Sequence, residues 1–541
     1  MTLKTYELGR YYRHLQSCGL VEECSADQAQ MLQEIEYISF DSKDIRKNTL
    51  FICKGAHFSP RYLQDAVLSG AVAYISETPY DPGEAGAVPH IIVSDIRAAM
   101  AQIAGIFYDN IWQKLHMIGI TGTKGKSSTA FFVKYIIDEY MKNTGGRESA
   151  VISGITNYDG VIDEESHLTT PESFEIYKHM YNAVNSGIEY LTMEVSSQGL
   201  KYDRTKGIMY DIGCFLNIGN DHISGIEHSS LEDYLTSKLI LFSQSRTVCI
   251  NSGSDKIGQI MAAAEKVRAD NEARGIDMPE IVTFGHESED DYFVYDITSP
   301  KGESGSITFS VKAPGFDERF ELSMRGLFNV DNALAAIAMT SCLGIPVEYI
   351  KAGLKKARVS GRMEFFTSSK RGYSVIVDYA HNQMSFETLF RSVKKEFPGK
   401  KISIVFGCPG GKAQNRRQEL GDIAGKYADM VYLTEEDAGE EPVVDICRQI
   451  ADHVSANGCP FRIIEDRGEA IRSAMRDADS NTVILLTGKG RETRQKRGLR
   501  YVDTPSDVEY VQEVLRFEYC YRLDDTEENE KQISKSPQAV G

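Results

Sequence analysis

Residues 115–128, LHMIGITGTKGKSS, are the stretch from which the organisation of the chain can be worked out. Residues 115–120 are largely apolar and predict a short buried strand, Gly122 and Gly125 predict a tight turn, and TAFFVKYIIDEY predicts the helix that follows. A strand, a glycine-rich loop and a helix N-terminus form a phosphate cradle, because backbone N–H groups and the positive end of the helix dipole point at the anion. The stretch therefore predicts a nucleotide-binding domain.

Several residues of this loop are candidates for contacts with the phosphates of a nucleotide: Gly122, Thr123, Lys124, Gly125, Lys126, Ser127 and Ser128. Lys126 would reach the β- and γ-phosphates, and the Ser127 hydroxyl would bind Mg²⁺. The common phosphate loop has glycine five residues before Gly125, but this chain has Ile120 there. The alternative interpretation is a glycine-rich turn with a surface lysine. The predicted strand and helix on either side favour the nucleotide site.

Length and composition indicate a multidomain globular protein. A chain of 541 residues is too long for one hydrophobic core, and about two to four domains are expected. The net charge of −18 argues against nucleic acid or an anionic membrane as the main partner. Ten cysteines are scattered without a CxxC pair, and the sequence has neither a signal core nor an apolar run of about eighteen residues. We therefore expect a cytoplasmic protein with reduced thiols and no membrane insertion.

Residues 1–112 predict a small N-terminal α/β domain, because short apolar runs alternate there with polar turns. Asp41, Ser42 and Lys43 follow one of these runs. They are a candidate anion-binding turn, but taken alone the three residues are more typical of a plain turn. Nothing else in this part of the chain indicates catalysis.

Residues 113–357 predict the central domain, in which polar residues follow apolar strands. IEYLTMEV (188–195) contains Glu194 near its end, where a nucleotide-binding sheet holds Mg²⁺. His222 follows a second strand, and the residues alone leave a ligand and a structural histidine equally open. Residues 229–242 predict a helix that begins at Ser229 or Ser230. Lys238 lies beside its apolar stripe, and the simplest expectation places its amine in water.

Residues 358–523 predict a C-terminal domain with a doubly wound parallel sheet. Apolar strands such as KISIVF and TVILLTG alternate with helical segments such as VVDICRQIADHV. Polar clusters follow the strands, and in such sheets ligands bind outside the carboxyl ends of the strands. Residues 524–541 are polar and charged with few apolar anchors, and we expect a disordered tail there.

Ten motifs resemble those of the Mur ligases and occur in the same order. They are GITGTKGKSS, LTTPES, MEVSSQGL, NIGNDH, YLTSK, NVDNALAA, SGRME, VDYAHN, VFGC and TGKGRE, within roughly residues 35–505. The resemblance implies an α/β protein with the three-domain Mur ligase architecture, in which a central P-loop ATPase domain precedes a C-terminal Rossmann-like domain. It also implies an ATP-dependent amide ligase that uses Mg²⁺ and converts a carboxylate to an acyl phosphate, which an amino group then attacks.

The resemblance assigns roles to individual residues. The contacts implied for the UDP-N-acetylmuramoyl-dipeptide substrate are Ser42, Thr169, Thr170, Ser196 and Arg204. The residues implied to hold Mg²⁺ are Ser127, Glu194, His222 and Lys238 in carbamylated form. The remaining ATP contacts implied are Asn329, Asn332, Arg362 and Asp378. The residues implied to position a free amino acid are Arg417, Gly488 and Glu492. Lys126, Glu194, His222 and Lys238 would serve catalysis.

Three residues depart from the family pattern. Gln198 and Arg491 stand where histidine is usual, and Asn382 replaces threonine after the histidine of VDYAHN.

Two other functions are considered. A folylpolyglutamate synthase-like ligase would not need residues 1–112. A noncatalytic ATP-binding regulatory module would leave Thr169, Thr170, Arg204 and Lys238 unexplained. The family members that match best add the third residue of the peptidoglycan peptide, and we expect a monomer.

The added amino acid is predicted from residues 436–439. Family members that add meso-diaminopimelate carry Asp-Asn-Pro-Arg, whose arginine pairs with the distal carboxylate, whereas this chain has EDAG. Further glutamates stand at 435, 440 and 441. This segment would repel a distal carboxylate and attract a distal ammonium, which predicts L-lysine. The alternative is that the acidic residues form a solvated loop and that selection lies elsewhere.

Overall fold

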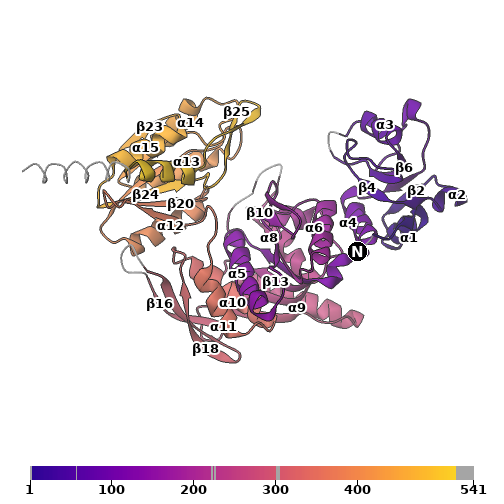
Figure 1. Ribbon diagram of the computed structural model, residues 1–541, viewed down its shortest axis with the longest axis horizontal. Helices are drawn as coiled ribbons and strands as arrows, with labels where there is room; N and C mark the ends of the chain where they lie inside the picture. The colour runs from indigo at the N-terminus through magenta and orange to yellow at the C-terminus, as the bar shows by residue number, and fades with distance from the viewer. Residues whose placement is uncertain (1–2, 56–57, 221–222, 224–226, 300–304, 519–541) are drawn as a thin grey trace, which may run out of the picture. The chain divides into compact units, whose positions relative to one another are not determined.

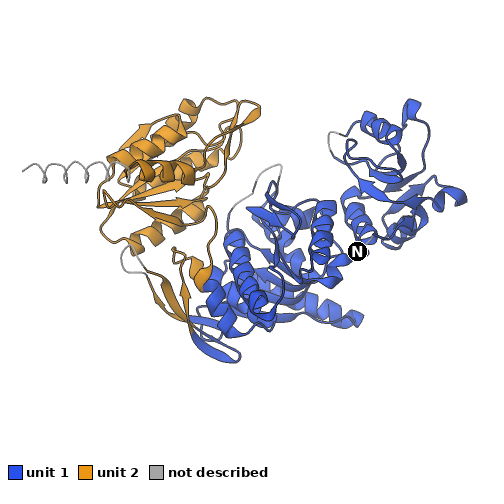
Figure 2. Cartoon of the chain, in the orientation of Figure 1, with its two compact units in different colours: residues 1–294, 311–318, 332–354 blue, residues 295–310, 319–331, 355–541 orange. Residues whose placement is uncertain are grey.

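The computed structural model describes residues 3–55, 58–220, 223, 227–299 and 305–518 (Figure 1). The chain forms two compact units (Figure 2). The first comprises Met1–Val294, Val311–Glu318 and Asn332–Leu354, and the second comprises the segments Tyr295–Ser310, Arg319–Asp331 and Lys355–Gly541. Because these units do not coincide with residues 1–112, 113–357 and 358–523, those boundaries stay predictions.

The first unit contains the predicted N-terminal α/β domain. Its five-stranded sheet has the order β2-β7-β6-β5-β4, with strands Val21–Cys24, His90–Val93, Ala71–Ser76, Thr49–Ile52 and Tyr37–Ser39. The accompanying helices are α1 (Leu8–Ser17), α2 (Gln28–Met31), α3 (Pro60–Leu68) and α4 (Ile96–Phe107). A small ladder joins β1 (Tyr6–Glu7) to β3 (Glu34–Ile35). Alternating apolar residues of these strands pack against the helices. One cluster, which includes Phe51, Leu63 and Tyr74, lies within this part of the chain, and the other continues into residues of the larger sheet described next.

The same unit holds a larger sheet that carries the phosphate loop. Three of its eleven strands lie beyond β15 and are described below, and the other eight follow the order β11-β10-β9-β12-β8-β13-β14-β15. Their bounds are Asp163–Glu165, Thr156–Tyr158, Ala150–Ile152, Tyr190–Glu194, His116–Thr121, Tyr210–Phe215, Ser245–Asn251 and Glu280–Gly285. The strands from β9 to β15 are parallel, so β8, β12 and β13 end at the same edge. That edge is where ligands bind in open α/β sheets.

Helices connect these parallel strands. They are α5 (Lys126–Thr144), α6 (Ser173–Asn185), α7 (Ser197–Lys201), α8 (Leu231–Leu239) and α9 (Ile257–Arg274). Short 3₁₀ turns lie at Gly83–Ala85 and Ile111–Lys114, before this sheet begins, and at Ile240–Gln244, directly after α8. The boundary between the two units passes through the segments that follow, which are β16 (Tyr292–Thr298), β17 (Ile307–Ala313), β18 (Phe316–Leu322), α10 (Asn329–Cys342) and α11 (Val347–Lys356).

The second unit is built on a six-stranded sheet of order β19-β20-β24-β21-β22-β23. The strands are Glu364–Thr367, Ser374–Asp378, Thr482–Thr487, Lys401–Phe406, Met430–Leu433 and Phe461–Ile463. All neighbours are parallel except β19, an antiparallel edge strand that the sequence pattern did not predict. A hairpin of β25 (Arg494–Arg497) and β26 (Arg500–Asp503) was also not predicted.

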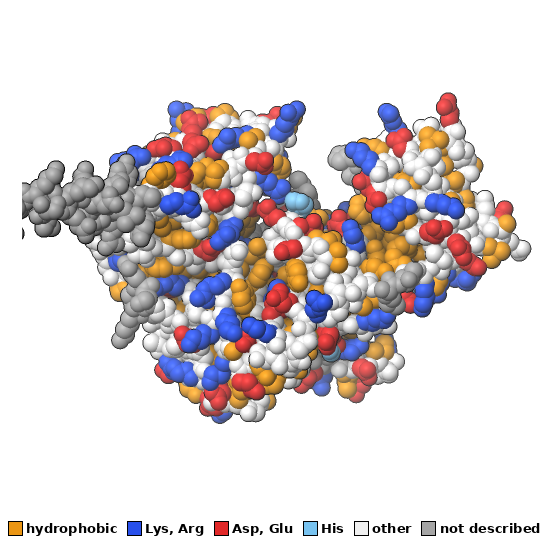
Figure 3. Space-filling model, in the orientation of Figure 1, with side chains coloured by type: hydrophobic (Ala, Val, Ile, Leu, Met, Phe, Trp, Pro, Cys, Tyr) orange, Lys and Arg blue, Asp and Glu red, His pale blue; other side chains and the backbone are white. Residues whose placement is uncertain are grey.

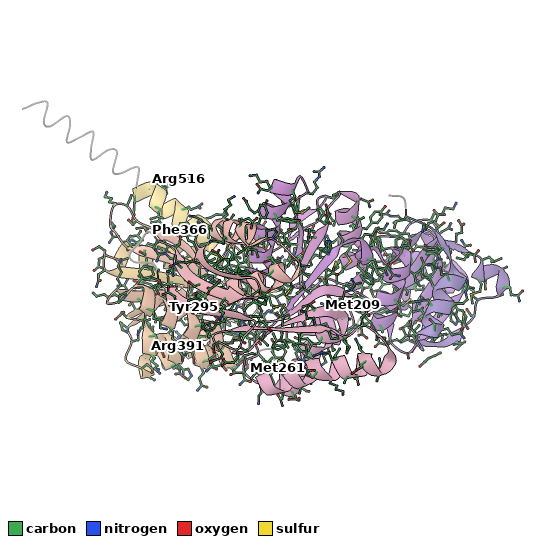
Figure 4. All side chains as sticks on the ribbon, turned by 90° about the horizontal axis from the view of Figure 1, so that it is seen from below. Met209, Met261, Tyr295, Phe366, Arg391 and Arg516 are labelled. Carbon is green, nitrogen blue, oxygen red and sulfur yellow. The ribbon has the colours of Figure 1, made fainter. Side chains whose placement is uncertain are left out.

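Helices cover both faces of this sheet, as a doubly wound fold requires. One face packs against α15 (Arg467–Asp477) and the helix at 507–518, through Val375, Val377 and other alternating residues. On the other face Phe386 of α12 (Gln383–Glu396) meets Phe406 of β21, with ring centroids 5.2 Å apart. The remaining helices are α13 (Asn415–Tyr427) and α14 (Val443–Ala456). Figure 4 marks Phe366 on β19 and Arg391 on α12.

One buried arginine ties the last helix to the sheet. Arg467, at the start of α15, donates from Nε and Nη2 to the two carboxylate oxygens of Asp507, at 2.6 and 2.7 Å. Nη2 also donates to the carbonyl oxygen of Thr487, at 2.7 Å.

Acidic and basic side chains are interspersed over the face of the molecule in Figure 3. None of the helices in the described part of the chain combines the length and apolar character needed to cross a membrane.

Candidate active site

The predicted phosphate loop joins β8 to α5. β8 ends at Thr121 and α5 begins at Lys126, close to where the sequence pattern places them. Gly125 has φ +86°, and a Cβ there would lie 2.2 Å from Oδ1 of Asn332, so this position requires glycine. Within the described residues, no side chain caps the N-terminus of α5. The loop therefore has the backbone conformation and the helix end that a phosphate cradle needs.

Asn217, just after β13, braces this loop. Its carbonyl oxygen accepts from the N–H of Thr123 at 3.0 Å, and its Oδ1 accepts from the N–H of Lys124 at 2.8 Å. Its Nδ2 donates to the carbonyl oxygen of Lys124 at 3.0 Å. The Asn217 side chain thus forms hydrogen bonds with both the N–H and the carbonyl oxygen of Lys124. The sequence analysis gave Asn217 no role, although it is the first residue of the NIGNDH motif.

Two lysines converge on one carbonyl oxygen of the loop. Lys126 Nζ donates to the oxygen of Gly122 at 2.9 Å, and Lys238 Nζ donates to the same oxygen at 2.8 Å. Lys238 is only 1% exposed, and its amine lies 4.4 Å from the ring centroid of Tyr234. The expectation that this amine lies in water is therefore wrong. The helix α8 turns Lys238 towards the phosphate loop, where its charge is buried.

The carboxyl end of β12 gathers several of the residues that the family resemblance singled out. Glu194 Oε1 accepts from the N–H of Gly154 at 2.8 Å, and its carbonyl oxygen accepts from Oγ1 of Thr170 at 2.9 Å. Oγ1 of Thr170 in turn accepts from the N–H of Ser196 at 2.9 Å. Nη1 of Arg204 donates to the carbonyl oxygen of Thr170 at 2.8 Å. Two separated motifs, LTTPES and MEVSSQGL, therefore meet Gly154 and Arg204 at one place beside β8.

Two further contacts extend this cluster. A Cβ on Gly154 would lie 3.3 Å from Oγ1 of Thr169, so Thr169 also borders it. Arg204 forms a salt bridge with Glu172 at 3.0 Å, and Lys54 from the N-terminal domain pairs with the same carboxylate at 2.5 Å. Lys54 was not among the predicted site residues. The feature of the sequence that could have identified Lys54 is a cationic residue just after the apolar strand β5.

Ser42 lies in a compact turn after β4. The N–H of Lys43 donates to Oδ1 of Asp41 at 2.9 Å, and the N–H of Asp44 donates to the carbonyl oxygen of Asp41 at 3.0 Å. The aspartate side chain therefore stabilises the turn, whereas the role of Ser42 towards an anion stays a prediction. The Ser196 hydroxyl likewise has a structural role, because it accepts from the N–H of Gly199 and caps α7.

In the second unit, Asp378 ends β20 and is buried. Its Oδ1 accepts from the N–H of Ala380 at 2.8 Å, and its Oδ2 accepts from the N–H of Met363 at 3.0 Å. Arg362 lies over the ring of Tyr379, 4.5 Å from its centroid. These two predicted ATP contacts therefore flank one strand end.

The other two predicted ATP contacts begin α10. Asn329 Nδ2 donates to the carbonyl oxygen of Arg325 at 2.7 Å, and Asn329 belongs to the second unit. Asn332 belongs to the first unit and lies against Gly125 of the phosphate loop. Asn382, which departs from the family pattern, caps α12 by accepting from the N–H of Ser385.

Glu436 lies where three neighbouring strands of the second sheet end. A Cβ on Gly488, after β24, would lie 2.1 Å from its Oε2, and a Cβ on Gly407, after β21, would lie 3.0 Å from its Cβ. Its carboxylate makes no hydrogen bond or salt bridge with the residues that the structure describes. Burial raises the pKa of Glu436 to about 7, against the opposing effect of Arg467 and Lys489.

Apart from Glu440, which is exposed, the other acidic side chains of this region have cationic partners. Arg497 pairs with Glu435 at 2.6 Å, and Arg417 pairs with Glu441 at 2.6 Å. Lys489 bridges two more, which are Asp437 at 3.1 Å and Glu492 at 2.6 Å. The expectation of a segment acidic as a whole is therefore corrected. Its flanks are neutralised, and Glu436 is the carboxylate that remains at the strand ends.

The family of the chain follows from its similarity to known proteins. One family model, described as the Mur ligase middle domain, matches residues 120–340, and another, described as the Mur ligase, glutamate ligase domain, matches residues 361–490. A UDP-N-acetylmuramyl-tripeptide synthetase of Lactobacillus delbrueckii subsp. bulgaricus is 36% identical over 495 residues, which cover 89% of this chain and 93% of that protein. The chain belongs to the Mur ligase family.

Other Mur ligases agree with this assignment. A protein of Enterococcus faecalis named UDP-N-acetylmuramoyl-L-alanyl-D-glutamate–L-lysine ligase is 35% identical over 480 residues, which cover 87% of this chain and 90% of that one. A solved structure of a UDP-N-acetylmuramoyl-L-alanyl-D-glutamate–2,6-diaminopimelate ligase has a TM-score of 0.64 at 21% identity and covers 95% of this chain and all of that one. The α/β Mur ligase fold class is therefore confirmed.

The residues around the phosphate loop are suited to bind a hard cation such as Mg²⁺. Glu194 is buried and its described partner at Oε1 is an amide N–H, so the carboxylate is not neutralised there. The Ser127 hydroxyl lies at the start of α5, and hydroxyl and carboxylate oxygens are ligands that Mg²⁺ prefers. No cluster of three metal-binding side chains forms among the described residues. His222 lies outside them.

The last departure from the family pattern concerns Arg491. Its guanidinium forms a bidentate pair with Glu364 of β19, with Nε and Nη2 at 2.6 and 2.7 Å from the two carboxylate oxygens. Arg491 therefore has a carboxylate of the protein itself as its partner. With this partner, Arg491 is not a free receptor for the distal carboxylate of an incoming amino acid.

Proposed function

We propose that this Mur ligase is an ATP-dependent amide ligase that adds a third amino acid, L-lysine, to UDP-N-acetylmuramoyl-L-alanyl-D-glutamate in the cytoplasm. The observation that carries the proposal is the meeting of the phosphate loop, the paired lysines at Gly122 and the cluster around Glu194 at one edge of the central sheet. The names of the relatives support the same substrate and the same added residue.

The loop and its lysines supply charge compensation in this proposal. ATP with Mg²⁺ would provide the phosphoryl group that activates the substrate carboxylate. Lys126, whose amine lies at the loop carbonyls, would move to the phosphates and offset the repulsion between two anions that have to approach to about 3 Å. Asn217 keeps the loop backbone in place while the lysine moves.

Lys238 is proposed to act as a carbamate. Its amine lies within hydrogen-bonding distance of the same oxygen as the amine of Lys126, and two cations at one buried oxygen repel each other. Loss of two protons from the Lys238 ammonium, together with addition of CO₂ to its nitrogen, would convert it into a carbamate anion, which removes the repulsion and gives an oxygen ligand for Mg²⁺ beside Ser127 and Glu194. By family resemblance, His222 would complete this set.

The substrate is proposed to bind along the cluster at β12. Thr170 is joined there by hydrogen bonds to Ser196 and Arg204, and Thr169 borders the same cluster. Ser42 would meet the diphosphate. The pairing of Arg204 with Glu172 keeps the guanidinium fixed in orientation. These residues would hold the D-glutamate carboxylate in line with the transferred phosphoryl group.

We propose that L-lysine is selected by Glu436 and by the absence of an arginine at Gly439. A carboxylate with no described partner, buried at the strand ends near Gly488 and Glu492, offers a counter-charge to a side-chain ammonium. A distal carboxylate in the same place would be desolvated beside a like charge, which costs several kcal/mol. Arg417, held by Glu441, would orient the amino acid from the neighbouring strand end.

The two rival functions explain fewer of these observations. A folylpolyglutamate synthase-like ligase would need no N-terminal domain, yet a match to 89% of the chain must include part of residues 1–112, which are about a fifth of it. A noncatalytic ATP-binding module would not require Lys238 to be buried at the loop carbonyl of Gly122.

The deciding experiment is a ligation assay with UDP-N-acetylmuramoyl-L-alanyl-D-glutamate, ATP and Mg²⁺. L-lysine, L-ornithine and meso-diaminopimelate compete in one reaction, and the products are separated by mass. We expect L-lysine to be incorporated preferentially and Lys126→Ala to abolish ligation while the thermal unfolding midpoint is retained. Preferential incorporation of meso-diaminopimelate would contradict the proposed selectivity, and incorporation of none would contradict the proposed reaction.

A further inference from the structure

The hairpin β25–β26 is joined to the segment 435–439 through backbone hydrogen bonds. The N–H of Gly439 donates to the carbonyl oxygen of Lys496 at 2.9 Å, and the N–H of Gly498 donates to the carbonyl oxygen of Gly439 at 2.7 Å. A parallel bridge also links Gly439 to Arg497. The hairpin thus adds a short ladder to the position where other family members carry arginine (Figure 1 labels β25).

Side chains reinforce this connection at Asp437. The buried Gln495 accepts from the N–H of Asp437 through Oε1 at 2.9 Å, and Oδ1 of Asp437 accepts from the N–H of Lys496 at 2.8 Å. Asp437 has φ +51°, a left-handed conformation that is unfavourable for a residue with a Cβ. The segment therefore holds this conformation because the hairpin supplies partners for it.

Arg497 of the hairpin and Lys489, which precedes it, pair with the two acidic residues on either side of Glu436. Arg497 neutralises Glu435 with two hydrogen bonds, at 2.6 and 2.9 Å, and Lys489 neutralises Asp437. Glu436, between these two residues, has no hydrogen bond or salt bridge within the described part of the chain. Its carboxylate is turned towards Gly488 at the end of β24.

We propose that the hairpin β25–β26 is a specificity-determining element, which fixes residues 435–439 and thereby sets where the Glu436 carboxylate meets the side-chain ammonium of the incoming amino acid. The inference rests on the proposed function, because it concerns the amino acid that is ligated. Gln495 is the positioning residue of this element. It touches no substrate and acts through the backbone of Asp437.

The test compares Gln495→Met with Gln495→Glu. Methionine keeps the length and loses the acceptor for the N–H of Asp437, whereas glutamate keeps an acceptor at the same reach. We expect Gln495→Met to raise the KM for L-lysine by about tenfold and to lower the preference for L-lysine over meso-diaminopimelate by a similar factor. Its kcat and its KM for ATP should stay within about twofold of the parent values. Gln495→Glu should recover most of the loss.

A matched control lies on the same hairpin. Leu499 is 80% exposed at the turn between the two strands, and Leu499→Ser should leave all kinetic constants and the preference unchanged. If Gln495→Met does not fold, Asp437→Gly is measured in its place. Glycine adopts φ +51° without strain, and the loss of Oδ1 frees the segment from Lys496, so the same rise in KM is expected.

The outcomes separate the two proposals. Unchanged lysine KM and unchanged preference in the folded Gln495→Met or Asp437→Gly variant would overturn the role of the hairpin, while L-lysine ligation by the parent enzyme would leave the proposed function standing. A parent enzyme that ligates no amino acid to the dipeptide substrate would overturn the proposed function itself.

Discussion

Lys238 is the residue whose surroundings say most about the chemistry of the central sheet. Its ammonium is buried at the carbonyl oxygen of Gly122, which the ammonium of Lys126 also contacts. In the proposed modification, this group loses its protons and the free amine adds CO₂, and the carbamate would remove the repulsion and provide a ligand oxygen for the cation. The geometry thus connects a side chain to a modification that sequence composition alone does not indicate.

We expect Lys238→Ala to lose roughly 10²-fold or more in kcat, because a charge that acts on the transferred phosphoryl group is removed. A small carboxylate such as formate should restore part of the activity by occupying the vacated space. Protein equilibrated with ¹³C-bicarbonate should show a carbamate carbonyl resonance that is absent from the alanine variant. Full activity of Lys238→Ala would contradict the proposed role.

In the proposed complex with L-lysine, the ionisation of Glu436 should make the affinity for lysine depend on pH. Burial raises its pKa to about 7, Arg467, Lys489 and Arg416 oppose this rise, and Asp437 adds to it. The ammonium of lysine pairs with the ionised form, so the KM for L-lysine should rise as the pH falls below about 7. Glu436→Gln should raise this KM at pH 8 and remove its pH dependence. A KM profile that is flat between pH 6 and 8 in the parent would contradict this account.

The raised pKa of Glu436 also affects the stability of the fold. A higher pH should favour lysine binding but lower the stability. A carboxyl group whose folded-state pKa exceeds its unfolded value binds more protons in the folded state, so stability falls as the pH rises from about 4.5 to about 7. Glu436→Gln should therefore raise the thermal unfolding midpoint at pH 8 and leave it nearly unchanged at pH 4.5. A lower midpoint at pH 8 would indicate that the carboxylate has a stabilising partner.

At the scale of elements, the phosphate loop depends on the strand beside it. Asn217 satisfies both polar groups of the Lys124 backbone, so Asn217→Ala should raise the KM for ATP by about tenfold and lower the stability by about 1–3 kcal/mol. Nucleotide binding by calorimetry and thermal unfolding measure the two effects. Asn143→Ala, near the other end of α5, removes a hydrogen bond within the helix itself and should leave ATP binding unchanged.

The regular elements were predictable because their patterns are strong. A largely apolar run followed by two glycines specifies β8 and its loop, and strands of the second sheet such as β20 and β24 are apolar on both faces. The hairpin β25–β26 was not predicted, since RQKR and RYVD lack apolar alternation and most of their side chains are exposed. β19 was missed because it is a short edge strand.

The candidate site was predictable in its residue types but not in its pairings. Family motifs placed Glu194, Thr170 and Arg204 in one site, and the structure brings them together. A one-dimensional pattern could not show that Lys238 points at the loop, because helical spacing gives the face of α8 and not its neighbour. Likewise, the sequence shows the acidic residues near Glu436 but not the distant cations that neutralise them.

At the scale of the whole molecule, the net charge of −18 has to coexist with an anionic nucleotide and an anionic substrate. The structure meets this requirement locally. Cations gather at the phosphate loop and around Glu172, where Lys54 and Arg204 share one carboxylate. Ionic strength should therefore affect substrate affinity less than the net charge alone suggests, since buried and partly buried charges are weakly screened.

The pairing of Arg467 with Asp507 sets how far the chain can be shortened. A protein cut after residue 505 would lose Asp507 together with the apolar Val508 and Val511, and a guanidinium would be left buried without its counter-charge, at a cost of several kcal/mol. A protein that ends at residue 518 keeps all three. We expect the longer version to be recovered from the soluble fraction of expressing cells and the shorter one from the pellet.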